Sequence, residues 1–186
     1  MTASIRPCSG IIGANDNINL QPILKTGNID VMVPWARSDT VYVDNVVWGH
    51  LLLEKKMQEE EAVGTLGRAS VVAGQVFAIT NREPVSFLEY YLKVKHYKPD
   101  VKFSFAPYYF LTLFAPFNEL LNRMGVMTPP PLNLVTPPML DVCRACYAYS
   151  DEKAGRVLGY SPMFTMDEGI MASIVEAKKW KTDGNA

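Results

Sequence analysis

Residues 39–57, DTVYVDNVVWGHLLLEKKM, decide the fold, because the period of the hydrophobic residues changes inside this stretch. Valines alternate with Tyr42 at its start, which predicts a short strand. Val47 and Leu51 then fall four residues apart, which predicts a helix. Asp44 stands at the join, where its carboxylate can accept from the free N–H groups of the first helical turn. A strand that leads into a capped helix is typical of an α/β protein.

The composition is that of a globular protein with one core. The chain has 186 residues, of which 48% are hydrophobic and 20% charged. A formal net charge of −1 argues against a nucleic-acid partner, since phosphate contacts need a basic surface. Three cysteines, Cys8, Cys143 and Cys146, favour a reducing compartment over a disulfide framework. The first residues show no pattern of a secretory signal.

Other stretches extend the alternation of strands and helices. We expect a glycine-flanked turn at residues 10–13. Pro84 suits the first position of a helix, and Ser150 can cap another helix that ends at Gly159. Thr165 and Glu168 form a capping box for a final helix. Strands are expected over residues 2–6, 29–33, 74–81, 101–105 and 146–149.

Several segments resemble, in the same order, those of the 3β-hydroxysteroid dehydrogenase family, a branch of the extended short-chain dehydrogenases. The similarity is greatest to its sterol-4α-carboxylate 3-dehydrogenases. The resemblance runs from Thr2 to Val175 and concerns the C-terminal half of the family. The segments are Arg6-Pro7 with Ser9-Gly10-Ile11, Tyr42 to Leu52, Gly74 to Asn81, Asp151 to Pro162, and Asp167 to Gly169.

The resemblance implies an α/β fold. It is that of the C-terminal portion of an NAD(P)-binding, Rossmann-like extended short-chain dehydrogenase, with a small mixed α+β substrate region. We predict one incomplete domain over residues 1–186. Within it, residues 1–62 would hold the last Rossmann strands and a helix, and residues 74–186 the region that covers the substrate. The family's glycine-rich phosphate loop and its catalytic Ser, Tyr and Lys belong to its N-terminal half.

Pro7, Cys8 and Ser9 are the candidate cofactor residues, because in the family the backbone after this proline lies beside the nicotinamide ring. Cys8 is an extra residue relative to the family pattern, and Ile12 and Ala14 replace a family aromatic residue and a proline. The resemblance implies NAD or NADP as cofactor. No catalytic residue and no metal ligand is predicted.

The implied reaction is oxidation of a sterol 3β-hydroxyl group to a ketone, with hydride passing to the nicotinamide. A 4α-carboxylate then leaves as carbon dioxide, and the new ketone accepts the electrons as an enolate. We expect that this chain cannot run the reaction alone, so its status as an enzyme stays open. One alternative is a non-catalytic protein that binds a sterol or a partner chain. Another is a fragment of an enzyme like the nucleotide-sugar epimerases.

An apolar stretch from Pro107 to Leu121, interrupted at Pro116, predicts a helix rich in aromatic residues. It fits a core helix, a lid over an apolar pocket, or peripheral contact with a membrane. The resemblance implies the cytosolic face of the endoplasmic reticulum membrane, with the cytoplasm as the alternative location. A sterol or steroid-like ligand is expected, and an exposed sheet edge also predicts a partner chain or a homo-oligomer.

Three patterns are interpreted as coincidences. Tyr91 and Lys95 match the spacing of the family's catalytic pair, but they follow the Arg6-Pro7 strand, whereas the family's pair precedes it. Cys143 and Cys146 form a lone Cys-x-x-Cys, short of the four ligands of a structural zinc site. The glycine pairs at residues 10 and 13 and at residues 64 and 67 lack the full phosphate-loop pattern and predict turns.

Overall fold

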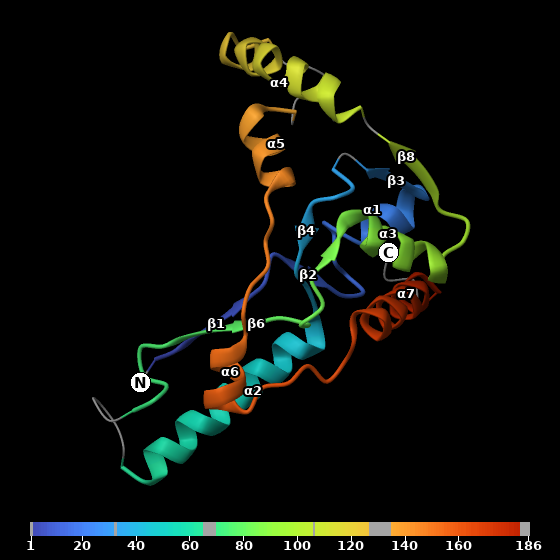
Figure 1. The fold of residues 1–186 in the computed structure, drawn as a ribbon. Coiled ribbons are helices and arrows are strands. Elements are labelled where there is room, and N and C mark those ends of the chain that lie inside the picture. Colours follow the sequence, from blue (N-terminus) through green and yellow to red (C-terminus); the bar gives the residue numbers. More distant parts are fainter. Residues whose placement is uncertain (1, 32, 65–69, 106, 127–134, 183–186) are drawn as a thin grey trace. The chain divides into compact units, whose positions relative to one another are not determined.

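The structure is a computed structural model, which describes residues 2–31, 33–64, 70–105, 107–126 and 135–182 (Figure 1). Its described residues form two compact units. The first unit comprises those within residues 1–26, 38–85 and 147–186, and the second unit those within residues 27–37 and 86–146. The α/β character expected from the sequence is confirmed in both units.

Parallel strand pairs form the framework of the first unit. β1 (Ser4–Pro7) pairs in parallel with β6 (Val76–Ile79), and β2 (Gly10–Ile12) pairs in parallel with β5 (Thr40–Tyr42). Parallel neighbours need a crossover connection, usually through a helix. Residues 10–12 therefore lie in a strand, so the turn predicted over residues 10–13 is wrong for most of its length.

Helix α2 (Val43–Ala62) is the crossover between β1 and β6, and it packs on this strand pair. Val46 and Leu53 of α2 enter a core cluster with Phe77 and Ile79 of β6. Gly49 allows the close approach, because a Cβ atom there would lie 2.9 Å from the Cδ1 atom of Ile79. The core of the first unit thus lies between α2 and the β1–β6 pair.

The start of α2 differs from the sequence prediction. The N-cap residue is Tyr42, whose side chain makes no capping hydrogen bond, and Asp44 lies inside the first helical turn. Capping by Asp44 is therefore wrong. The strand leads directly into the helix, so the helix starts from the extended backbone of Tyr42. The carboxylate of Asp44 remains near the positive end of the helix dipole.

The C-terminal helices of the first unit are α6 (Glu152–Leu158) and α7 (Met166–Thr182). Gly159 ends α6 with φ +71°, and Thr165 and Glu168 exchange hydrogen bonds as a capping box, so both predictions are confirmed. The N-cap residue of α6 is Asp151, but the predicted capping hydroxyl of Ser150 accepts from the N–H of Glu152 in the first turn, at 3.3 Å. The strand predicted over residues 146–149 is reduced to one bridge between Ser38 and Tyr147. A short helix, α1 (Gln21–Thr26), precedes the second unit in sequence.

The second unit contains a further parallel pair, β3 (Asn28–Val31) with β8 (Lys102–Phe105), and helix α3 (Phe87–Tyr97). A capping box between Ser86 and Glu89 starts α3. The prediction that Pro84 occupies the first helical position is therefore wrong, because the Ser86 hydroxyl provides the stronger start signal two residues later. The remaining strands in the described residues are two short ones, β4 (Arg37–Ser38) and β7 (Val85–Ser86).

Helices α4 (Tyr108–Arg123) and α5 (Pro137–Arg144) pack together in the second unit. Their small core contains Leu111, Ala115 and Leu140. α4 runs through Pro116 as one helix, so the interruption predicted at this residue does not occur. None of the helices in the described part of the chain combines the length and the hydropathy required to cross a membrane.

Candidate functional site

The carboxyl ends of β1 and β6 lie side by side, because Pro7 is the partner of Ile79 in the register of the pair. The N–H group of Cys8 continues the ladder by donating to the carbonyl of Ile79 at 3.1 Å. In open α/β sheets, ligands bind outside the carboxyl ends of the parallel strands. This edge is therefore the candidate functional site of the first unit.

Residues that follow β1 are held against the segment before β5. The Ser9 hydroxyl donates to the backbone carbonyl of Asp39 at 2.9 Å and shares a hydrogen bond of 2.5 Å with the Ser38 hydroxyl. Burial of Cys8, helped by the charge of Asp39, raises the pKa of its thiol to about 12. The thiol is thus protonated at neutral pH and is not a nucleophile. The structure fixes these residues at the sheet edge, and their cofactor role remains a prediction.

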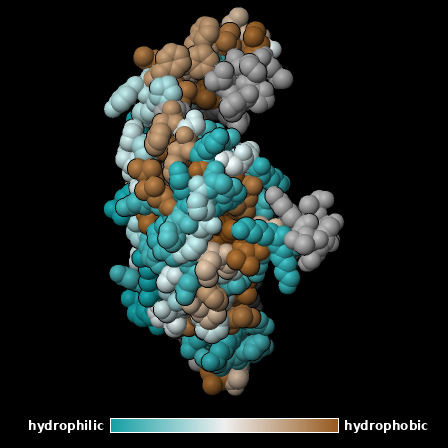
Figure 2. Space-filling model, turned by 90° about the vertical axis from the view of Figure 1, so that its right-hand side faces the viewer, coloured by the Kyte–Doolittle hydropathy of each residue, from teal (hydrophilic) through white to brown (hydrophobic). Residues whose placement is uncertain are grey.

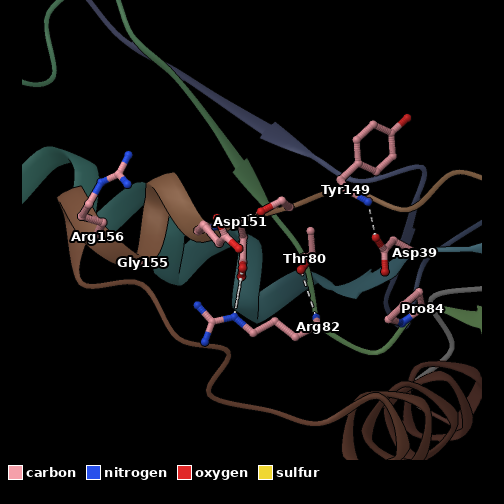
Figure 3. A pocket seen from close by; sticks show the side chains of 10 residues that line it. Asp39, Thr80, Arg82, Pro84, Tyr149, Asp151, Gly155 and Arg156 are labelled. Carbon is pink, nitrogen blue, oxygen red and sulfur yellow. Dashed lines mark hydrogen bonds and ion pairs between the residues drawn. The ribbon is translucent and has the colours of Figure 1, made fainter.

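A pocket of about 700 Å³ opens beside the carboxyl end of β6 (Figure 3). Its wall combines the segment after β6 with the start of α6, and both belong to the first unit. The lining includes Asp39, which accepts from Ser9, but none of the three candidate cofactor residues. The lining residues are Asp39, Thr80, Arg82, Pro84, Tyr149, Ser150, Asp151, Glu152, Gly155 and Arg156.

Arg82 and Asp151, both in the lining of this pocket, form an ion pair, and Figure 3 shows their side chains facing one another. The Nε atom of Arg82 donates to both carboxylate oxygens of Asp151, at 2.8 and 3.0 Å. The Nη2 atom of Arg82 also donates to the carbonyl of Tyr160 at 3.0 Å. Among the described residues, Arg82 is the one non-glycine residue with positive φ, at 59°. These contacts fix the strained backbone after β6 against α6.

Asp39 is buried in the pocket wall, with 2% of the residue exposed. Its Oδ2 atom accepts from the backbone N–H of Tyr149 at 2.6 Å, while its buried Oδ1 atom has no partner in the structure. Burial raises the pKa of this carboxyl above its ordinary value. The pocket lining therefore contains a carboxyl group, that of Asp39, which loses its proton at a higher pH than an ordinary aspartate.

Replacing Asp39 by asparagine is expected to remove a pH dependence of stability. Because the pKa of Asp39 is higher in the folded chain than in the unfolded one, its contribution to stability is complete in acid and is lost as the pH rises through the folded pKa. Relative to the native chain, Asp39→Asn should thus be stabilised more at pH 7 than near pH 4. Urea denaturation at both pH values measures the difference. A variant that loses stability equally at both would contradict this assignment.

The Tyr91 and Lys95 pair lies on α3 of the second unit, and its interpretation as a coincidence of spacing stays a prediction. Burial raises the pKa of Tyr91, with the nearby Cys143 and Asp30 contributing, whereas a catalytic lysine would lower it. The Lys95 ammonium lies 4.9 Å from the centre of the Phe103 ring. The surroundings of Tyr91 and of Lys95 are both consistent with the interpretation that their spacing is a coincidence.

Cys143 and Cys146 are free thiols, half-buried and exposed respectively. Within the described ranges, no group of three or more His, Cys, Asp or Glu side chains could hold a metal ion. The second glycine pair, at residues 64 and 67, extends outside the described residues.

Two asparagines form a buried clamp that the sequence analysis missed. Asn45 donates to the Oδ1 atom of Asn81 at 2.8 Å and to the carbonyl of Phe164 at 2.7 Å. The Oδ1 atom of Asn45 accepts from the N–H groups of Met163 and Phe164, at 2.8 and 3.0 Å. The clamp joins the start of α2, the end of β6 and the segment before α7. An asparagine followed by two valines in the first turn of the helix is the available signal.

Known proteins resemble this chain in sequence and in fold. The family model described as "3-beta hydroxysteroid dehydrogenase/isomerase family" matches residues 1–100. "Sterol-4-alpha-carboxylate 3-dehydrogenase, decarboxylating" from Mus musculus is 29% identical over 184 residues, which cover 94% of this chain and 47% of that protein. The protein of the same name from Bos taurus is 30% identical over 184 residues, covering 91% of this chain and 47% of that protein.

A solved structure shows the same fold. UDP-glucuronic acid 4-epimerase from Bacillus cereus, in complex with UDP-glucuronic acid and NAD, superposes with a TM-score of 0.57 at 14% identity. The superposition covers 95% of this chain and 45% of the epimerase chain. The Rossmann-like extended short-chain fold expected from the sequence is thereby confirmed. The chain spans about half the length of the curated relatives that it matches, 47% in the two above.

Proposed function

Because this chain belongs to the 3-beta hydroxysteroid dehydrogenase/isomerase family, we propose that it supplies the substrate-side half of an NAD(P)-dependent oxidoreductase that acts on sterols. The reaction is oxidation of a 3β-hydroxyl group to a ketone, with loss of a neighbouring 4α-carboxylate as carbon dioxide. The names of the mouse and bovine relatives support this substrate class. Because the chain covers about half of each relative, the activity of those whole proteins is carried over only as a proposal.

The observation that carries the proposal is the position of Pro7, Cys8 and Ser9. They leave β1 at the carboxyl edge of the parallel pair, the edge at which α/β sheets bind ligands. Pro7 has no N–H group, and the N–H group of Cys8 and the hydroxyl of Ser9 donate within the chain. This segment fits one face of a nicotinamide ring, and it offers no group for a pyrophosphate. When bound, NAD(P) would accept the hydride from the sterol C3 atom.

Hydride transfer needs a catalytic Tyr and Lys, and we do not assign this role to Tyr91 and Lys95, because they follow the Arg6-Pro7 strand whereas the family's pair precedes it. We therefore assign the phosphate loop and the catalytic Tyr and Lys to a nucleotide-binding half of the family type. A non-catalytic sterol-binding or interaction protein is the second candidate, and the exposed apolar faces favour it. An epimerase-like activity is supported by fold alone, at 14% identity.

Calorimetric titration with NAD and NADP tests this assignment, with circular dichroism to confirm that the purified chain is folded. The account predicts no binding of either nucleotide by the folded chain alone, since the groups that bind the pyrophosphate are assigned elsewhere. Micromolar binding by the chain would contradict it.

Helix α4 provides the apolar surface that a membrane location requires. Leu111 and Ala115 face α5, while the opposite face of α4 is exposed. Figure 2 shows hydrophobic side chains gathered at the upper end of the view, where α4 lies. We propose that this face, within Pro107 to Leu121, lies in the interface of the endoplasmic reticulum membrane. The exposed residues are Tyr109, Phe110, Leu113, Phe117 and Leu120, followed by Met124 beyond that range.

Replacing Leu113 and Phe117 by glutamate is expected to weaken binding to phospholipid vesicles by more than about tenfold. Each side chain is more than half exposed, so the change does not disturb the core. Burial of one such side chain in an apolar phase contributes about 1.5–3 kcal/mol, and 1.4 kcal/mol is a factor of ten. Vesicle co-sedimentation measures it. Leu92→Glu, at an exposed position of α3, is the control, and equal losses in both variants would contradict the assignment to α4.

A further inference from the structure

The two units differ in charge. Residues 27–37 and 86–146, the second unit, contain seven Lys and Arg against five Asp and Glu, which gives a formal charge of +2. Because the whole chain carries −1, the rest of the sequence carries −3. Exposed charges act over about 8–10 Å at physiological ionic strength, so a partner that meets the second unit responds to the local charge and not to the net charge.

The basic excess of the second unit is concentrated in residues 93–102, KVKHYKPDVK, which run from α3 into β8. These residues contain four lysines and one aspartate. Lys98 is paired with Asp100, and 2.6 Å separates the Nζ atom from the Oδ2 atom. Among the described residues, no carboxylate forms an ion pair with Lys95 or Lys102. The ammonium groups of these two lysines can therefore attract an anionic partner.

Aromatic side chains accompany the lysines. The Lys95 ammonium lies 4.9 Å from the centre of the Phe103 ring, a cation–π contact in which the lysine keeps its charge. The Phe103 ring stacks on that of Phe105, with 6.2 Å between the ring centres. Phe105 is 62% exposed. Lysines combined with exposed aromatic side chains are typical of segments that lie at the surface of an anionic membrane.

β8 leads into α4, the helix with the exposed apolar face. β8 ends at Phe105, and α4 begins at Tyr108. Lys102 precedes Tyr108 by six residues, so even a fully extended chain keeps it within about 20 Å of the start of α4. A bilayer that contacts α4 therefore comes close to the lysines as well. Residues 93–105 are called the basic–aromatic segment below.

We propose that the basic–aromatic segment binds the headgroups of anionic phospholipids in the membrane that α4 contacts. This inference rests on the membrane location given under the proposed function, and it adds the class of lipid. Charge complementarity supports it, because an anionic surface attracts basic segments that lie within about a Debye length. The net charge of −1 on the whole chain predicts the opposite, a weak repulsion, so a preference for anionic lipid would have to come from local charge.

The test is co-sedimentation of the whole chain with vesicles of phosphatidylcholine alone and with vesicles in which about one third of the lipid is phosphatidylserine. Binding to the anionic vesicles is expected to be at least about tenfold tighter, and raising the salt to about 1 M should remove the difference, because the Debye length falls to about 3 Å. Replacing both Lys95 and Lys102 by glutamine should reduce the preference about tenfold, since each lysine near an anionic surface contributes to binding.

The matched control replaces Lys55 and Lys179 by glutamine. Both lysines are exposed and belong to the first unit, so this variant loses the same charge outside the basic–aromatic segment. It should keep the preference for anionic vesicles. Circular dichroism confirms that the native chain and both variants are folded.

Two results would overturn this inference alone. One is equal binding to the two kinds of vesicle, provided that replacing Leu113 and Phe117 by glutamate weakens both. The other is a preference for anionic vesicles that both glutamine variants reduce equally. A chain that binds neither vesicle would overturn the membrane location of α4 together with this inference. A preference that depends on Lys95 and Lys102, but not on Leu113 and Phe117, would overturn the assignment to α4 and support this inference.

Discussion

Replacing Asn45 by alanine is expected to lower the free energy of unfolding by about 2–4 kcal/mol, which is a large part of the stability of an ordinary domain. Asn45 is fully buried and makes four hydrogen bonds. Alanine removes all four, so the partly buried N–H groups of Met163 and Phe164 lose their partner, whereas the side chain of Asn81 keeps its hydrogen bonds with Tyr42 and Phe164. Each buried group without a partner costs about 1–3 kcal/mol, and the costs are not additive.

Urea denaturation followed by circular dichroism measures this change, with Asn17→Ala as the control at an exposed asparagine. Phe164 accepts from both Asn45 and Asn81, so the loss should spread to the segment before α7. A loss for Asn45→Ala within about 0.5 kcal/mol of that for Asn17→Ala, the range of ordinary surface changes, would show that the clamp does not hold these three segments together.

Replacing Gly169 by alanine is expected to destabilise the chain by about 1–3 kcal/mol, although alanine is the better helix former. A Cβ atom at Gly169 would lie 2.8 Å from the Cβ and Cγ atoms of Tyr42. Tyr42 is buried and forms the N-cap of α2, so its Cβ atom cannot move without moving the strand and helix that it joins. Overpacking should therefore outweigh the gain in helix propensity.

Gly155→Ala is the matched control, because Gly155 also lies in a helix of the first unit. A Cβ atom there would lie 3.2 Å from the Nη2 atom of Arg82, so a shift of a few tenths of an ångström is enough to accommodate it. Thermal denaturation of both variants should give a lower midpoint for Gly169→Ala and little change for Gly155→Ala. Equal stabilisation of the two would show that α7 does not pack on Tyr42 as closely as described.

The sequence predicts the parts of this fold that depend on local pattern. Three features depend only on interactions within a few residues: the change of period at Asp44, the left-handed Gly159 and the capping box at Thr165. The structure contains the strand-to-helix change and both helix ends. Where two local signals compete, the prediction fails. Pro84 suits a helix start, but the Ser86 hydroxyl is closer to the apolar face of α3 and takes that role.

The candidate site depends on contacts between distant residues, and these cannot be derived from the sequence alone. Ser9 meets Asp39 across 30 residues, and Arg82 meets Asp151 across 69. Cys8 illustrates the difference: the resemblance to the family places it in the predicted cofactor segment, but its burial beside Asp39 is known only from the fold. Residues 146–149 form a single bridge because their partner, Ser38, belongs to a strand of only two residues.

The most direct test of the central claim is nicotinamide reduction by this chain and the complementary part of the mouse relative, with a 3β-hydroxysterol that carries a 4α-carboxylate. Neither polypeptide alone should reduce NAD or NADP, and the two together should do so with release of carbon dioxide. The substrate-side assignment would be contradicted if this chain alone reduced the cofactor. It would also be contradicted if the folded complex failed to reduce it.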